Sequence, residues 1–336
     1  MRGLQIDGYT SEDNLDALAL EAQCAQGRTL VIRFRRPTFH ARSEVYDTYR
    51  ILCARVDGVL AGTAAWAEKS VILHGERIKA AYCYDLRVLP SHRSKGVAMH
   101  LTRALFDDIG DDMDCIYTLV AAENERCVKP AQHLFGMKLA VPCTDCVIPV
   151  YRLRRGAGQC QSARFAEVHD AYLRNRPREF VTSLPGDRLL GLAGSMVRTD
   201  GTDAGCSLWT NENLLAEEVL RVPRTFRALR PVVTCLRPFV NLPRVPRSGE
   251  VFRSWFIFDM FAESDRAALG LLAAVNNRAL AEHRRFLYMF LQNNDPMLNL
   301  VCRKGHCIHR IPYLLLAKGR VLPRVTDHIY IDVRDL

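Results

Sequence analysis

The stretch of residues 78–109 most constrains the fold, because it joins a long strand pattern directly to an amphipathic helix pattern. Ile78 to Leu89 is rich in Tyr, Val and Leu and ends at Pro90. Val97 to Ile109 then repeats apolar residues at helical spacing. Only a short basic turn lies between them. We therefore expect a sheet in which one strand leads into the amino terminus of a helix.

The neighbouring segments extend this pattern into a mixed α/β domain. Tyr49 to Val56 and Val59 to Trp66 flank Asp57-Gly58, a dipeptide that suits a two-residue turn with positive φ and so predicts a hairpin. Cys115 to Ala122 and Val147 to Leu153 read as further strands. We assign residues 1–155 to a first domain.

The second half repeats the order strand, helix, strand, helix after a linker at residues 156–161. The repeat covers residues 251–261, 265–282, 286–292 and 296–303. We therefore predict an α/β fold with a mixed sheet, in two tandem copies, the second degenerate and covering residues 162–336. Within the second copy, the prolines of residues 223–246 exclude one continuous helix over that stretch.

The charge of the chain favours an anionic partner. A net charge of +9 suits a phosphorylated cofactor, a nucleic acid or a membrane surface, and an ordinary solvated basic surface explains it equally. Nucleic acid is disfavoured because no block of like charges occurs. The most apolar stretch, Tyr313 to Ala317, is too short to span a bilayer. With no signal-peptide pattern at the amino terminus, we expect a cytoplasmic protein with no membrane partner.

Two groups of cysteines raise the question of a metal site. One is Cys143-x-x-Cys146. The other is formed by Cys302, His306, Cys307 and His309. Zinc needs ligands that converge as a tetrahedron, whereas alternate residues of an extended segment point to opposite faces. We therefore expect reduced core cysteines and no metal.

The basic turn Arg93-Ser94-Lys95-Gly96-Val97-Ala98 is the candidate for binding chemistry. A helix that begins here offers unpaired backbone N–H groups to an anion such as a pyrophosphate. Gly96 would let the backbone approach phosphate oxygens, and Ala98 would keep the helix close to its strand. The alternative interpretation is an exposed basic turn before an ordinary helix.

This turn resembles the cofactor-binding motif of the GNAT superfamily of N-acetyltransferases. Arg93-x-x-Gly96-x-Ala98 follows the strand Tyr82 to Leu89, and Tyr117 to Ala122 with Glu123-Asn124 resembles the next segment of that superfamily. The resemblance covers residues 1–155. A narrower resemblance, to the plant hookless family of probable N-acetyltransferases, rests on residues spread over the whole chain: Leu86-Arg87-Val88, Pro90, His92-Arg93, Gly96, Glu123-Asn124, Leu134-Phe135 and Ile329 to Asp335.

The resemblance implies a GNAT-like acyl-CoA N-acyltransferase fold that takes acetyl-CoA as acetyl donor and an amine as acceptor. It implies that Leu86, Arg87 and Val88 pair with the pantetheine arm and that Asn124 meets the thioester region. The backbone of residues 93–98 would hold the pyrophosphate, with added charge from Arg93 and Lys95.

A general base must free the amine lone pair for attack on the thioester. Tyr82, Asp85 and Glu123 are the candidates near the expected acetyl position, although a strand tyrosine is often a core aromatic and Asp85 could cap a bulge. Many relatives carry a tyrosine that protonates the leaving thiolate, and the stretch Val128 to Gln132 has none.

Three functions are therefore weighed. The first is an N-acetyltransferase that uses acetyl-CoA directly, and the second is a catalytically weak acetyl-CoA binder or scaffold. A nucleic-acid-binding module ranks last. The second half offers no equivalent loop, since Glu263 and Asp265 would repel a pyrophosphate there. We expect it to bind no cofactor and either to shape the acceptor site or to pack structurally against the first half.

Overall fold

The computed structural model describes residues 3–27, 30–182, 189–199, 204–236, 239–240, 243–303 and 307–336. In the first half the elements run β1 (Leu4–Gly8), η1 (Ser11–Asp13), α1 (Asn14–Gln23), β2 (Val31–Arg35), η2 (Ala41–Val45), β3 (Tyr49–Val56), β4 (Val59–Leu73), β5 (Glu76–Val88), η3 (Pro90–His92), α2 (Val97–Ile109), β6 (Cys115–Ala121), α3 (Glu125–His133) and β7 (Leu139–Pro149). This confirms the mixed α/β order expected for that half.

The second half runs through a similar order with one insertion. Its elements are β8 (Cys160–Ala163), α4 (Phe165–Asn175), β9 (Val181–Thr182), β10 (Leu192–Arg198), β11 (Ala204–Trp209), β12 (Ala216–Arg221), α5 (Arg224–Leu236), β13 (Val251–Phe252), β14 (Ser254–Ala262), α6 (Asp265–Ala281), β15 (Phe286–Gln292), α7 (Pro296–Arg303), β16 (His309–Gly319) and η5 (Val333–Asp335). The insertion comprises β12, α5 and β13.

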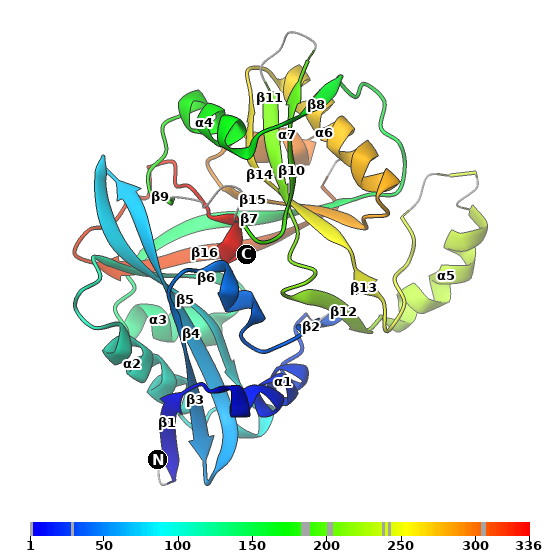
Figure 1. Ribbon diagram of the computed structural model, residues 1–336. Helices are drawn as coiled ribbons and strands as arrows, with labels where there is room; N and C mark the ends of the chain where they lie inside the picture. Colours follow the sequence, from blue (N-terminus) through cyan, green and yellow to red (C-terminus); the bar gives the residue numbers. More distant parts are fainter. Residues whose placement is uncertain are drawn as a thin grey trace.

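Both halves contribute to one sheet and exchange their last strands. The 13-stranded sheet has the order β1-β3-β4-β5-β6-β16-β7-β15-β14-β11-β10-β8, with β9 paired to β4. Strand β16 from the second half lies between β6 and β7, and β7 from the first half pairs with β15. The linker near residue 156 therefore separates the halves in sequence but not in the sheet, as Figure 1 shows.

Helices cover both faces of this sheet. On one face, α2 and α3 pack on the strands of the first half and α6 and α7 on those of the second. On the other face lie α1, α4 and the segment that ends in η5, and their core joins residues of both halves. In Figure 1 the carboxyl end of the chain lies over the middle of the sheet. The second face is therefore where the two halves meet.

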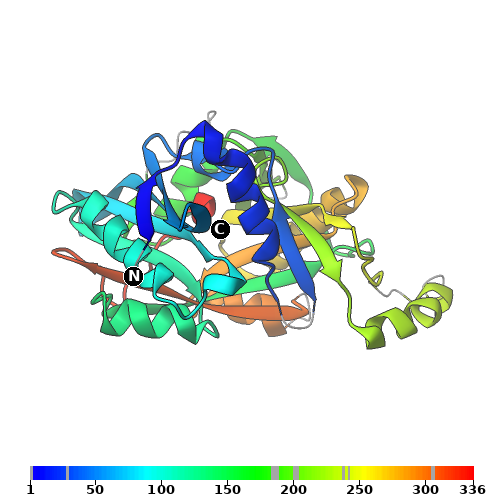
Figure 2. The ribbon, with the colours of Figure 1, turned by 90° about the horizontal axis from the view of Figure 1, so that it is seen from below.

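The inserted elements lie to one side of this body. Strands β13 and β12 form a small sheet with β2 of the first half. Helix α5 has no buried residue and projects outward in the views of Figures 1 and 2. It contains Pro231 and ends at Leu236, so the prediction that no single helix spans residues 223–246 is confirmed.

Two parallel strand pairs diverge at a bulge, one in each half. Strands β5 and β6 pair only from Ala80 to Tyr82, and β5 then carries an extra residue at Asp85, which has φ of 51°. In the second half β14 stops pairing with β15 at Ile257 and is bulged at Asp259, with φ of 49°. A bulge twists its strand and frees backbone groups from the ladder, so each half has a gap beside a bent strand.

Candidate functional site

The turn between β5 and α2 has the backbone geometry of an anion site. Ser94 has φ of 63°, and Gly96 begins the helix with φ of 83°, a conformation that favours glycine. No side chain caps α2. The backbone N–H groups of its first turn therefore remain for a ligand, in the place where the sequence predicted them.

A cleft of about 1090 Å³ opens beside this turn and passes through the gap between β5 and β6. Its lining includes Val97 and Phe106 of α2, which packs on one face of the sheet. It also includes Phe256 and Tyr288 from the opposite face. A ligand that enters along the loop can therefore reach the second half through the sheet.

Most of the sequence-predicted binding residues lie together in this cleft. The lining residues among them are Tyr82, Asp85, Leu86, Arg87, Val88, Arg93, Ser94, Gly96, Val97, Ala98 and Asn124. Lys95 and Glu123 are not among the lining residues. Glu123 is exposed, because it follows the end of β6 before α3 begins. The role of Glu123 as a general base stays a prediction.

Asp85 is held in a buried ion cluster. Its carboxylate lies 2.9 Å from Arg36 Nη1 and 3.0 Å from Arg42 Nη1, and Arg87 approaches it at 3.3 Å. Burial opposes its ionisation, but the three guanidinium groups outweigh burial and hold the pKa of Asp85 well below its usual range. A carboxylate with so low a pKa is a poor proton acceptor, so its geometry favours a role in holding the bulge.

The two strand tyrosines are engaged as well. The Tyr82 hydroxyl donates to the Asp335 carbonyl at 2.6 Å, and the Tyr84 hydroxyl donates to Ser43 Oγ at 2.8 Å. Burial raises the pKa of Tyr82 well above its usual value. Both rings are core aromatics. This is the alternative to a general-base role that the sequence analysis gave for a strand tyrosine.

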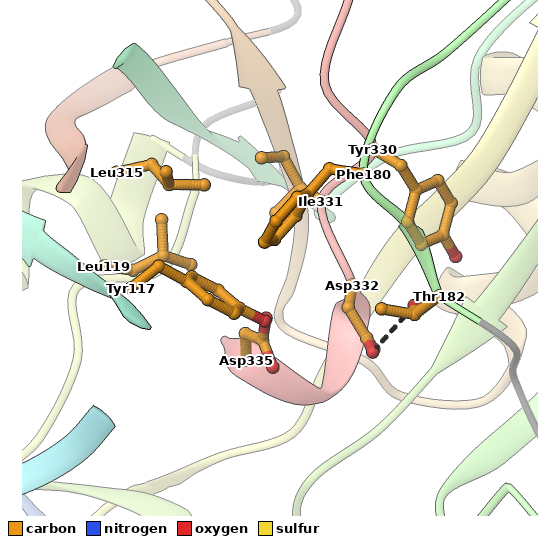
Figure 3. Close-up of a pocket in the computed structure, with 9 residues that line it drawn as sticks. All are labelled: Tyr117, Leu119, Phe180, Thr182, Leu315, Tyr330, Ile331, Asp332 and Asp335. Carbon is orange, nitrogen blue, oxygen red and sulfur yellow. Dashed lines mark hydrogen bonds between the residues drawn. The ribbon is translucent and has the colours of Figure 1, made fainter. Parts of the chain in front are cut away.

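The segment that ends in η5 is anchored beside β6. Tyr117 Oη donates to Asp335 Oδ2 at 2.7 Å, and Thr182 donates to Asp332 at 3.0 Å. Figure 3 shows the Tyr117 hydroxyl pointing toward Asp335 and the Thr182 contact beside it. Lys69 pairs with both carboxylates, at 2.5 and 2.8 Å. This network fixes one wall of the cleft.

Sequence reasoning missed an acidic patch at the far end of the cleft. Asp145 on β7 and Glu217 on β12 both line it, together with Tyr288 and Tyr313. The start of β7 at Leu139, where the sequence had indicated a strand only from Val147, places Asp145 inside the sheet. The signal available in the sequence was a charged residue within an otherwise apolar strand, Val141 to Pro149.

The expectation of reduced core cysteines without a metal stays a prediction. Cys143 and Cys146 belong to different core clusters on opposite faces of β7. The sulfur atoms of Cys146, Cys302 and Cys307 all lie within 4.8 Å of one another. Helix α7 and the residues just before β16 bring Cys302 and Cys307 to β7 from distant positions, which strand alternation alone does not reveal. His306 lies outside the described residues.

The second half has a bulge that corresponds to the one at Asp85, but the start of its helix α6 differs from the cofactor loop before α2. The Asp259 carboxylate at its bulge accepts from His169 Nδ1 at 2.7 Å, in place of the arginine cluster. The first turn of α6 is capped by Ser264, whose Oγ accepts from the Ala267 N–H. A capped helix offers fewer free N–H groups. This supports the prediction that the second half binds no cofactor at this position.

Comparison with known proteins agrees with this geometry. Residues 6–126 match the family described as acetyltransferase (GNAT) domain. No curated protein matches the chain. The structure of Saccharomyces cerevisiae N-myristoyltransferase with bound myristoyl-CoA is similar, with a TM-score of 0.63 and 10% identity over 95% of this chain and 83% of that one.

A second similar structure is a GCN5-related glucosamine N-acetyltransferase region in a fungal multi-domain β-N-acetylglucosaminidase. Its TM-score is 0.55, with 16% identity over 93% of this chain and 38% of that one. The chain therefore has a GNAT-like mixed α/β fold, and the match to the GNAT acetyltransferase domain lies in its amino-terminal part. The described helices include none long and apolar enough to cross a membrane.

Proposed function

We propose that the protein is an N-acetyltransferase that transfers the acetyl group of acetyl-CoA directly to an amine. The supporting observation is that the uncapped amino terminus of α2 and the gap between β5 and β6 open into one cleft. In this proposal the loop N–H groups of residues 93–98 hold the pyrophosphate. The backbone freed at the bulge, from Leu86 to Val88, pairs with the pantetheine arm, and Asn124 lies near the thioester.

The cofactor assignment is tested by titrating acetyl-CoA into the full chain in a calorimeter. Gly96→Glu places a carboxylate at the helix start in a strained conformation, and we expect acetyl-CoA affinity to fall at least about a hundredfold. Gly75→Glu is the matched control, because Gly75 also has positive φ, 82°, with no atom within 4 Å of an added Cβ. Equal affinity in the wild type and Gly96→Glu would contradict the assignment.

A second candidate function is a catalytically weak acetyl-CoA binder. The observation that favours it is that the Tyr82 and Tyr84 hydroxyls and the Asp85 carboxylate all have partners. Helix α3 also carries no tyrosine. Thiol release with peptides, polyamines and aminoglycosides distinguishes the two, since binding without release across that panel favours the binder. A matching panel of longer acyl-CoA donors tests the preference for acetyl.

We also propose a cytoplasmic location and kinship with the plant hookless family. The sequence motifs from Leu86 to Gly96 and near the carboxyl end support the second proposal. The division into units of residues 1–155 and 162–336 is proposed in the same sense, with the second unit shaping the acceptor site.

A further inference from the structure

We propose that Asp145 and Glu217 form the acceptor pocket and bind the ammonium group of a small cationic amine. This inference rests on the proposed function and names the class of its acceptor. The pocket lies in the same cleft as the cofactor loop and combines Asp145 of the first half with Glu217, Phe256 and Tyr288 of the second half. Its aromatic rings lie on the face of the sheet opposite α2, so donor and acceptor would enter from opposite faces.

The Asp145 side chain lies in the sheet, with no hydrogen-bond or ion-pair partner in the part of the chain that the structure describes. It sits on β7 between Ile311 of β16 and Phe290 of β15, and 9% of its surface is exposed. Its Oδ1 atom is buried with no hydrogen-bond donor among the described residues. A buried carboxylate oxygen without a donor is costly, and an ammonium group, with three N–H donors, would satisfy it.

Glu217 contrasts with its neighbour in sequence. On β12, Glu218 points to the opposite side and pairs with Arg33 at 2.9 Å. Glu217 points into the cleft, where its Oε2 accepts from the Tyr288 hydroxyl at 3.0 Å and no described residue forms an ion pair with it. On β12, therefore, the Glu218 carboxylate is neutralised by Arg33, and the Glu217 carboxylate remains available to a ligand.

Aromatic rings complete the pocket. Tyr288 stacks on Phe256 with ring centroids 5.1 Å apart, and Phe290 packs against Tyr313 at 5.2 Å. All four rings line the cleft. Aromatic faces attract cations, most strongly where water is excluded. Two acidic groups and four rings together indicate an organic cation in preference to an anion or a neutral sugar.

The charged groups that act on Asp145 are few. Glu217 is the charged group whose field reaches Asp145. Tyr288 and Tyr313 share this field, and Arg42 is the cation that reaches Tyr313. Because Arg42 is bound to Asp85, it leaves the acidic pair without a counter-ion of its own.

The test measures binding of 1-butylamine to the full chain saturated with coenzyme A, which cannot acetylate the probe. An alkyl amine keeps its charge up to about pH 9, so a change of affinity below that pH reports the protein. The measurement is made well below that pH, where the probe is an ammonium ion.

Variants separate charge from shape. Asp145→Asn and Glu217→Gln should each weaken 1-butylamine binding about tenfold to a hundredfold. Glu218→Gln, on the other side of β12, should leave the affinity within about twofold. Butan-1-ol, which has similar shape and no charge, should bind at least about tenfold more weakly than the amine.

Each outcome decides one point. Coenzyme A binding with no preference for the amine over butan-1-ol, or unchanged amine binding in Asp145→Asn, would overturn the acceptor pocket and leave the proposed function standing. A chain that binds neither acetyl-CoA nor coenzyme A in the first titration would overturn the proposed function, and the acceptor role with it.

A separate observation carries a second inference: we infer that Cys146, Cys302 and Cys307 bind a zinc ion through their thiolates. Three sulfur atoms within 4.8 Å of one another need only a small contraction to reach the spacing of about 3.8 Å that tetrahedral zinc imposes. The thiols come from β7, α7 and the segment just before β16, so a bound ion would tie both halves together where their strands exchange.

Elemental analysis of the full chain after dialysis against zinc tests this second inference. We expect about one zinc per chain, with loss of most of it in Cys146→Ser and in Cys302→Ser. Cys83→Ser, a buried cysteine of another core cluster, is the control and should retain the metal. A wild-type chain free of zinc after loading would overturn the inference, as would zinc content unchanged in both cluster variants.

Discussion

Replacing Asp85 by Asn is expected to destabilise the fold strongly, because it removes one negative charge from a buried cluster. The side chain of Asp85 is 4% exposed, and those of Arg36 and Arg87 are exposed by 0% and 6%. The second acidic group of the cluster is Glu21, whose carboxylate lies 2.9 Å from Arg87. Asparagine has nearly the same shape and tolerates positive φ, so the change isolates the charge.

Breaking a buried ion pair costs about 3–5 kcal/mol, because the partner cation is left uncompensated. Here the arginines retain Glu21 and several carbonyl oxygens as partners, so we expect a loss of about 3 kcal/mol. Urea unfolding followed by tryptophan fluorescence measures it. Glu125→Gln removes an ion pair with Lys129 in which both side chains are more than half exposed, and it should cost less than about 1 kcal/mol.

The pH dependence of this difference has a definite sign. The pKa of Asp85 is lowered in the folded state, so its contribution is present above the unfolded value of about 3.9 and is lost as the pH falls toward the folded value. The gap between wild type and Asp85→Asn should therefore stay constant from about pH 8 to 5 and narrow below about pH 4. A loss under about 1 kcal/mol at neutral pH would refute the argument.

Four further changes test the packing. Lys69→Met leaves the Asp332 and Asp335 carboxylates with less compensation and should cost about 3 kcal/mol in urea unfolding. Leu101→Ala, at a fully buried position, should cost about 2–5 kcal/mol in the same assay. Gly62→Ala places a Cβ 2.8 Å from the Arg87 carbonyl oxygen of β5 and 2.9 Å from Leu101 Cδ1, so β5 must shift beside the cofactor loop and calorimetry should show weaker acetyl-CoA binding. Ser264→Ala removes the cap of α6 and should lower the unfolding free energy by about 1 kcal/mol. Losses near zero would contradict each packing argument.

Local patterns predicted most of the individual elements. Helix α2 runs from Val97 to Ile109 and β15 from Phe286 to Gln292, as expected, because their apolar periodicity is strong and their ends carry turn residues. The hairpin at Asp57-Gly58 also forms, with positive φ at both residues. These features depend on residues close in sequence.

Long-range pairing was the part that the sequence could not supply. The insertion of β16 between β6 and β7 joins Tyr313 to Ala121 and to Cys143, across large sequence separations. Periodicity identifies a strand but not its neighbour, so the acidic pocket built around Asp145 could not be assembled from local patterns. Likewise, the partners of Asp85 lie on segments whose approach depends on the completed fold.

The most direct measurement is a crystal structure of the full chain grown with saturating coenzyme A. We expect the pyrophosphate within hydrogen-bonding distance of the backbone N–H groups of residues 93–98 and the pantetheine arm between β5 and β6. A cofactor bound elsewhere, for instance in the gap beside Asp259, or a cleft that stays empty at saturation, would contradict the account.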